Sequence, residues 1–173
     1  MKTQYITPTN SEKVMNDNDF IVSKTDTSGK ITYCNRIFME MAGYQEDELL
    51  GVNHNIIRHP DMPRGAFKLV WDTIQEGKEI FAFVKNLRKD GGFYWVFTHI
   101  TADYDHNKNI VGYTSVRRAP NKSAIAAIVP LYEKMIQVEK SAGIDASIQI
   151  LLDFLNANNV EYSPLILSLQ GDK

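Results

Sequence analysis

Alternating apolar and polar positions indicate two β-strands early in the chain. The runs FIVSKT (20–25) and ITYCN (31–35) are rich in β-branched and aromatic residues. They are separated by DTSG, whose Asp, Ser and Gly favour a tight turn. This pattern predicts a β-hairpin that begins near Asp19.

Apolar residues at helical spacing predict three helices between residues 36 and 77. The first covers RIFMEMA and ends at Gly43, and the second covers QEDELL and ends at Gly51. The third begins after Pro63 and ends before Gly77. Its apolar stripe consists of Phe67, Val70, Trp71 and Ile74.

Strand-like runs return after residue 78. EIFAFVKN and FYWVFTHITA are joined by the turn sequence KDGG, and NIVGYTSVRR follows a second polar turn. The order of two strands, short helices and three strands predicts an α+β domain, with an antiparallel sheet and helices on one face. Such a sheet can hold a ligand between its inner face and the helices.

The last fifty residues are predicted to be helical. SAIAAIVPLYEKMIQVEK carries an apolar stripe that Pro130 is expected to kink, and a second apolar helix is expected after Gly143. The first eighteen residues are polar and predict a flexible tail. We therefore divide the chain into a tail (1–18), a folded domain (19–119) and a C-terminal helical segment (120–173).

The composition of the chain indicates which kinds of partner and which cellular compartment to expect. The formal net charge of -2 gives no basic field, so nucleic acid is not expected as a partner. No apolar run is long enough to cross a bilayer and the N-terminus lacks a signal-peptide core, so we expect a cytoplasmic protein without membrane insertion. Cys34 is the single cysteine and cannot form an internal disulfide or a thiolate metal site.

Strand alternation points to the side chains that would line a pocket. Ile80, Ala82, Val84 and Asn86 share one face of their strand. An amide on an apolar face needs hydrogen-bond partners, which either the edge of a planar heterocycle or nearby backbone groups could supply. In the last strand, Tyr113, Ser115 and Arg117 also share a face.

The stretch NHNIIRHPDMPRGAF (53–67) concentrates histidines, arginines and an aspartate. His54 and His59 are five residues apart, which does not place two metal ligands on one helical face. A haem needs only one axial histidine, so haem remains an alternative. No nucleophile elbow, P-loop or HExxH motif is present, and we expect no enzymatic activity.

Several motifs resemble those of one family. SKTDTSGKITYCN, GYQEDELLG, HNIIRHPDMPRGAF, WDTI, VKNLRKDGGFYWV and GYTSVRR occur in the order found in PAS domains, and they closely resemble those of Aer-type aerotaxis and energy-taxis sensors. The similarity runs from about residue 19 to about residue 133. It implies a PAS fold whose five-stranded antiparallel sheet and helices hold FAD noncovalently.

The resemblance also implies roles for individual residues. In this family the Arg, His and Asp of RHPD matter for FAD binding, which corresponds to Arg58, His59 and Asp61 here. A forked guanidinium suits a pyrophosphate. The residues alone leave a second reading, in which Asp61 caps the next helix and pairs with Arg58 at the surface.

Four further residues are implied as cofactor contacts. Asn86 corresponds to the asparagine that flavin-binding PAS domains direct at the polar edge of the ring. Trp71 corresponds to a tryptophan near the flavin in a related redox regulator, although its spacing also suits a core residue. Arg117, beside Ser115, lies where light-sensing relatives place a glutamine at flavin N5, and its fixed charge would stabilise anionic reduced flavin.

One departure from the Aer-type family and one difference from light-sensing PAS domains are visible. Ile80 stands where Aer members carry a tryptophan six residues before the strand asparagine, which implies weaker cofactor binding. The NIIRHP region has no cysteine, so a blue-light photoadduct is not expected.

The expected function is an FAD-binding redox sensor that signals to a membrane-bound chemotaxis transducer. The C-terminal helices are the expected signalling segment and could also form a homodimer. The alternative is an interaction module of the same fold that carries no cofactor or binds haem.

Overall fold

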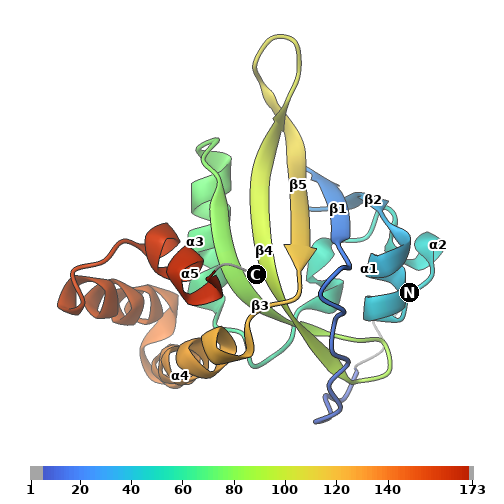
Figure 1. Cartoon of the computed structure of the whole chain (residues 1–173). Helices are drawn as coiled ribbons and strands as arrows, with labels where there is room; N and C mark the ends of the chain where they lie inside the picture. Colours follow the sequence, from blue (N-terminus) through green and yellow to red (C-terminus); the bar gives the residue numbers. More distant parts are fainter. Residues whose placement is uncertain (1–5, 172–173) are drawn as a thin grey trace.

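Five antiparallel strands form one sheet in the computed structural model, which describes residues 6–171. Their order across the sheet is β2-β1-β5-β4-β3 (Figure 1). The strands are β1 (Ile21–Asp26), β2 (Ile31–Cys34), β3 (Ile80–Leu87), β4 (Phe93–Tyr104) and β5 (Ile110–Arg118). The predicted α+β fold and the two early strands are confirmed.

Short helices between β2 and β3 cover one face of this sheet (Figure 1). They are α1 (Arg36–Ala42), α2 (Glu46–Leu49), the 3-10 helix η1 (His54–Ile57) and α3 (Arg64–Gln75). Asn35 caps α1 by accepting a hydrogen bond from the backbone N–H of Phe38, and Gly43 ends the helix with a φ of 78°. The chain therefore stays on the inner face of the sheet from residue 36 to residue 75.

The two faces of β3 carry different neighbours, as strand alternation predicts. Ile80 and Ala82 pack with α3 on the inner face. Phe83 points the other way and joins a cluster with the C-terminal helices, where the Tyr132 hydroxyl donates to the Phe83 carbonyl at 2.8 Å. The inner face of the sheet is therefore left to α3 and η1.

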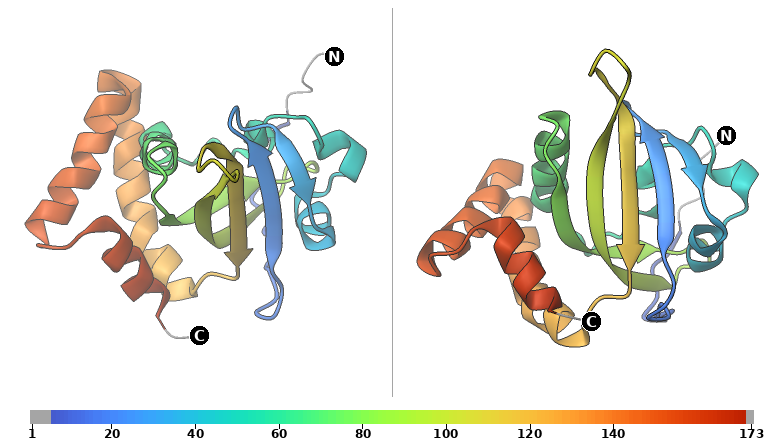
Figure 2. Two further views of the ribbon diagram at one scale, coloured as in Figure 1. Left: turned by 90° about the horizontal axis from the view of Figure 1, so that it is seen from above. Right: turned by 45° about the horizontal axis from the view of Figure 1, so that its top comes forward.

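The C-terminal segment forms α4 (Lys122–Ala157) and α5 (Tyr162–Gln170). The break within α4 lies at Gly143, whose φ of 84° and ψ of -176° are not helical, in agreement with the second helix expected after this residue, whereas the kink expected at Pro130 stays a prediction. Pro130 keeps a helical backbone, and its neighbours Leu131 and Tyr132 are buried. At Gly143 the chain turns back, so the two halves of α4 lie side by side as a helical hairpin (Figure 2).

Both ends of the domain are attached more closely than the sequence predicts. Residues 6–18, expected to be part of a flexible tail, run beside the β3–β4 turn, where the N–H of Lys13 donates to the carbonyl of Phe93 and Met15 is buried. Residues 1–5 of that predicted tail lie outside the described residues.

Gln170 attaches the end of α5 to the start of α4. Its side chain accepts from the N–H of Asn121 at 3.0 Å and donates to the carbonyl of Ala119 at 3.2 Å. Across residues 6–171, no helix combines the length and the apolar character that a membrane crossing requires.

Candidate functional site

A cavity of about 310 Å³ lies between the inner face of the sheet and the helices η1 and α3. This volume falls at the lower end of the range of roughly 300–1,000 Å³ that is typical of small-molecule sites. Apolar side chains supply much of the wall: Ile57, Phe67, Val70, Trp71, Ile74, Val84, Ile100, Tyr113 and Ile144. Such a wall suits the body of a planar ligand, whose orientation the remaining polar groups would fix.

Asn86 presents a buried amide to this cavity, where the amide also interacts with the hydroxyl of its cross-strand neighbour Tyr94. The side chain of Asn86 is 4% exposed, and its Nδ2 makes no hydrogen bond of normal geometry among the described residues. Backbone groups therefore do not supply a hydrogen-bond acceptor for Nδ2, which was the alternative considered from the sequence. Nearby on the same face of the sheet, the hydroxyls of Thr98 and Ser115 bond to each other at 2.9 Å. A buried unpaired donor is costly and favours a ligand that accepts a hydrogen bond.

Arg117 contributes a buried positive charge from β5. Its Nη2 donates to Ser23 Oγ at 2.9 Å and to His54 Nε2 at 2.8 Å. Nη1 is buried without a partner. Burial lowers the pKa of Arg117 to about 10, so its guanidinium stays charged at neutral pH. Arg117 therefore places a positive charge at the cavity, and its Nη1 is a hydrogen-bond donor that is available to a ligand.

His54 is held in its neutral form by this contact. A guanidinium only donates, so Nε2 of His54 carries a lone pair. Burial first, and then the charge of Arg117, lower the pKa of His54 from 6.5 to about 3. The ring also stacks on Phe38 with 5.7 Å between centroids.

This pKa predicts acid destabilisation. The unfolded chain binds the His54 proton below about pH 6.5 and the native state only below about pH 3, so stability falls as the pH is lowered across this window. We expect the melting temperature of His54→Gln to depend less on pH between 6.5 and 3 than that of the unmodified chain. Calorimetric scans at several pH values measure the difference.

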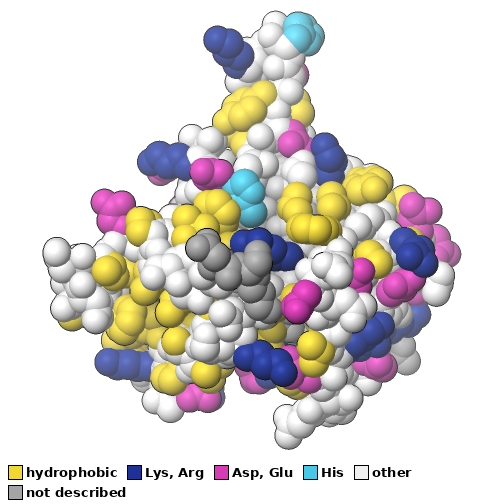
Figure 3. All heavy atoms as spheres, in the orientation of Figure 1, with side chains coloured by type: hydrophobic (Ala, Val, Ile, Leu, Met, Phe, Trp, Pro, Cys, Tyr) yellow, Lys and Arg dark blue, Asp and Glu magenta, His cyan; other side chains and the backbone are white. Residues whose placement is uncertain are grey.

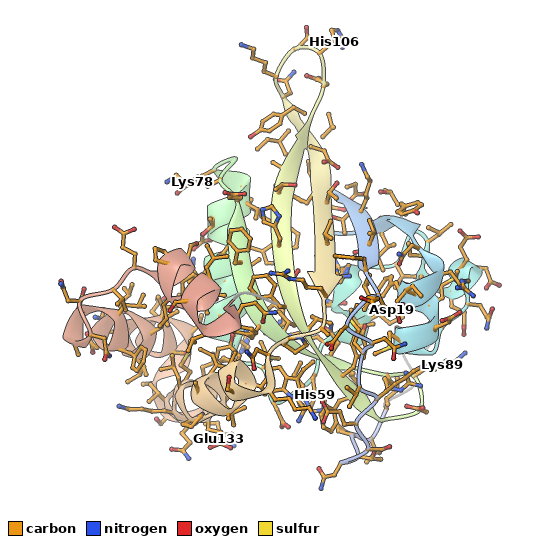
Figure 4. All side chains as sticks on the ribbon, in the orientation of Figure 1. Asp19, His59, Lys78, Lys89, His106 and Glu133 are labelled. Carbon is orange, nitrogen blue, oxygen red and sulfur yellow. The ribbon has the colours of Figure 1, made fainter. Side chains whose placement is uncertain are left out.

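His106→Gln is the matched control, because His106 lies at the exposed tip of the β4–β5 hairpin (Figure 4). Its profile should follow that of the unmodified chain. Identical slopes for all three proteins would contradict a buried neutral His54.

Arg58 lies on the helical side of the same cavity. Its guanidinium carbon is 4.3 Å from the centroid of the Phe67 ring, and its Nη2 is buried without a partner. Burial lowers the pKa of Arg58, the charge of Arg64 lowers it further, and Glu139 opposes both. Arg64 and Lys68 line the cavity beside it. The unused donor of Arg58 and the neighbouring cations Arg64 and Lys68 together favour an anionic ligand group.

His59 and Asp61 do not line the cavity. Asp61 forms an ion pair with Lys85 at 2.7 Å, and its side chain is 63% exposed. His59 is 2% exposed, and its Nδ1 accepts from the N–H of Asp61 at 3.1 Å (His59 is labelled in Figure 4). Asp61 therefore neither caps α3, whose cap residue is Pro63, nor pairs with Arg58.

The structure brings five of the seven predicted residues to one cavity: Arg58, Trp71, Asn86, Ser115 and Arg117. Trp71 is at once a pocket residue and a packing residue, since its ring meets Tyr113 edge-on at 5.6 Å. Sequence reasoning missed Ser23, Arg64, Lys68 and Ile144, and it considered His54 only as a metal or haem ligand. Strand alternation could have identified Ser23, whereas no local signal marks Ile144.

The charged side chains that line the cavity are all cationic, while Asp72 pairs with Lys68 and Glu139 opposes Arg58 from outside the lining. Arg58, Arg64, Lys68 and Arg117 all line the cavity, and none of the lining residues within 6–171 is an aspartate or glutamate. No group of three metal-ligating side chains occurs in this part of the chain. Cys34 is buried in the separate cluster around α1 and lies outside the cavity. The site therefore suits an anion with an aromatic or heterocyclic body.

Comparisons with known proteins give a consistent picture. A family model described as the PAS fold matches residues 31–117. The aerotaxis receptor of Escherichia coli K12 is 38% identical over 131 residues, which cover 76% of this chain and 25% of the receptor. A nitrogen fixation regulatory protein of Klebsiella pneumoniae is 28% identical over 97 residues, or 56% of this chain and 20% of that protein. The chain thus spans a quarter or less of these curated relatives.

Solved light-oxygen-voltage domains share the fold. One that was studied with a flavin analogue has a TM-score of 0.56 at 27% identity, covering 66% of this chain and 86% of that one. The light-state domain of the blue-light photoreceptor Aureochrome1 has a TM-score of 0.57 at 25% identity, covering 66% and 90%.

Proposed function

Because the chain belongs to the PAS-fold family, with a PAS domain similar to that of the aerotaxis receptor, we propose that it is a sensor that binds FAD and reports the redox state of the flavin. The observation that carries this proposal is the set of unpaired buried donors on Arg58, Asn86 and Arg117 around one cavity without an acidic side chain. Flavin carbonyl and ring nitrogen atoms accept hydrogen bonds, and a dinucleotide adds phosphates. The residues present therefore fit this group.

Each pocket residue has a proposed task. Asn86, Ser115 and Arg117 would bind the polar edge of the ring from the sheet, while Trp71 would pack against its apolar body. Arg58, joined by Arg64 and Lys68, would bind the phosphates. FAD would supply the reversible electron transfer, and the protein supplies orientation, exclusion of water and a fixed positive charge.

His59 and Asp61 are proposed to act on binding indirectly. The Asp61–Lys85 ion pair joins the loop after η1 to β3, and the buried His59 ring packs against Phe93 with 6.0 Å between centroids. Arg58 lies in the same loop, where it forms an isolated β-bridge with Asn86. Loss of either neighbour would loosen the loop that holds the phosphate-binding guanidinium.

Signal output is proposed to pass through the C-terminal helices to a membrane-bound chemotaxis transducer. Hydrophobic side chains gather over these helices in the space-filling view (Figure 3). Among the large apolar side chains of these helices, Leu152, Phe154 and Leu167 are exposed. Exposed apolar side chains on one segment suit contact with a receptor helix or a second copy of the chain.

An absorption spectrum tests the cofactor directly. The purified chain, after incubation with FAD and gel filtration, should retain the two visible bands of oxidised flavin, and dithionite should bleach them. A Soret band in the purified chain would instead indicate haem, and a chain that retains neither group would be an interaction module. Either of these results would overturn the proposal.

The proposed role of Arg58 predicts a ligand-dependent effect. Arg58→Ala should weaken FAD binding about 10- to 100-fold and leave riboflavin, which lacks phosphate, within about twofold, because one charge-assisted contact is worth roughly 1.5–3 kcal/mol. Titration of both ligands by flavin fluorescence measures the two affinities.

Arg36→Ala removes the same charge from exposed α1 and serves as the control. Equal losses for FAD and riboflavin in Arg58→Ala would refute the phosphate assignment.

A further inference from the structure

The C-terminal hairpin reaches the cavity at its turn. Gly143 breaks α4 with φ 84° and ψ -176°, a conformation that is essentially restricted to glycine. Ile144, the next residue, lines the cavity beside Arg64, Phe67 and Lys68 of α3. This residue lies outside the segment 31–117 that matches the PAS fold. One lining residue of the site therefore comes from a part of the chain that the sensor-domain motifs do not cover.

A single carboxylate fixes the hairpin at this position. Glu139, before the break, accepts from the N–H of Gly65 at 2.7 Å and from the hydroxyl of Ser147 at 2.8 Å. The first bond joins the hairpin to the start of α3, and the second joins its two halves across the break. Glu139 therefore ties together the three segments that surround Ile144.

The packing between α3 and the second half of α4 leaves no space for a side chain at Gly65. A Cβ atom added to Gly65 would lie 2.7 Å from Ser147 Oγ and 3.3 Å from a side-chain carbon of Ile148. Ser147 itself is buried. The second half of α4 is thus seated directly on the backbone of α3, the helix that carries the cationic side of the cavity.

We infer that the C-terminal hairpin forms part of the ligand site, with Ile144 as a binding residue and Glu139 as the positioning residue that holds it against the mouth of the cavity. This inference rests on the proposed function and deepens it. A ligand that contacts Ile144 stabilises the seated hairpin, and by linkage the seated hairpin stabilises the ligand by the same free energy. Ligand binding in the cavity would then stabilise the C-terminal helices, which are proposed to carry the output signal, by direct contact and not through the sheet.

Titrations with FAD on the full chain test the inference. Ile144→Ala and Glu139→Ala should each weaken binding about five- to tenfold through lost apolar contact and lost positioning. Glu139→Gln keeps an oxygen that accepts from both Gly65 and Ser147, so it should stay within about twofold of the unmodified chain. Lys140→Ala, on an exposed site of the same helix, is the control and should bind normally.

Hydrogen exchange supplies the second readout. FAD should slow amide exchange across residues 136–150 in the unmodified chain, and Ile144→Ala should reduce this protection. This measurement keeps the inference testable even if Glu139→Ala fails to fold.

The outcomes separate this inference from the proposed function. An unmodified chain that binds FAD with no change of exchange in residues 136–150, and with full affinity in Ile144→Ala, would overturn the role of the hairpin alone. Equal losses in Glu139→Gln and Glu139→Ala would overturn Glu139 as a positioning residue. An unmodified chain that binds no flavin would overturn the proposed function and this inference with it.

Discussion

Replacing Asn86 by leucine is expected to weaken FAD binding by about 10- to 100-fold while leaving the ligand-free fold intact. The amide is buried, its Nδ2 makes no hydrogen bond of normal geometry beyond its interaction with the Tyr94 hydroxyl, and one or two hydrogen bonds lost to a ligand are worth roughly 1–3 kcal/mol. Leucine has a similar volume and removes a buried donor that the empty fold leaves unsatisfied. Calorimetric titration measures the affinity, and thermal unfolding of the ligand-free protein measures the stability.

The two readouts for Asn86→Leu should therefore diverge. Affinity should fall, whereas the melting temperature of the ligand-free chain should stay level or rise. Asn107→Leu, on the exposed β4–β5 turn, should change neither quantity. A folded Asn86→Leu protein with unchanged affinity would place the amide outside the reach of the ligand.

Replacing Arg117 by methionine is expected to lower the midpoint potential of bound flavin by on the order of 50–90 mV. A unit charge about 4 Å away is worth roughly 4 kcal/mol at an effective dielectric constant of 20, and 30 mV corresponds to about 1.4 kcal/mol for two electrons. Arg117 is proposed to stabilise the anionic reduced ring, so its loss should make reduction harder. Spectroelectrochemical titration of the FAD-loaded protein gives the potential.

The neighbours of Arg117 should keep their places in the Arg117→Met variant. Ser23 Oγ and His54 Nε2 lie 3.2 Å apart and can still bond to each other when the guanidinium is removed. Arg118→Met removes the same charge from the opposite face of β5, where Arg118 covers the ring of Phe97. Its potential should stay close to that of the unmodified chain, and equal shifts in both variants would show that Arg117 acts only through overall charge.

The arrangement of helices and strands could be predicted because local rules agree with one another along residues 19–119. Strand alternation correctly placed Asn86 and Arg117 on the inner face, since a side chain in a regular strand can point only to one side or the other. Gly43 and Gly51 likewise marked the ends of α1 and α2. These inferences required only information from neighbouring residues.

Features that depend on distant contacts could not be predicted in this way. Pro130 keeps a helical backbone within α4, where Leu131 and Tyr132 are buried through contacts that no local pattern reveals, whereas the break at Gly143 agrees with the second helix expected there. The segment 6–18 looked flexible because its polar side chains hide the backbone bonds that it makes to the β3–β4 turn.

The RHPD cluster illustrates the same limit within the site. Adjacent residues in a loop have no fixed alternation, so sequence could not decide which of them would reach a ligand. Lys85 attracts Asp61 to the surface, while Phe67 supports Arg58 beside the cavity. Both partners lie several residues or more away in the chain, on β3 and α3 respectively.

The bonds of Gln170 set the kind of movement that the C-terminal helices can make. Because the side chain of Gln170 is tied to the backbone at Ala119 and Asn121, α4 and α5 begin and end at the same point beside β5. The turn at Gly143 lies at the other end of this loop, where Glu139 holds it to the start of α3. Between these two attachments the Tyr132 hydroxyl bonds to the Phe83 carbonyl of β3, so α4 and α5 can respond to the cavity only as a segment that is fixed to the domain at both of its ends.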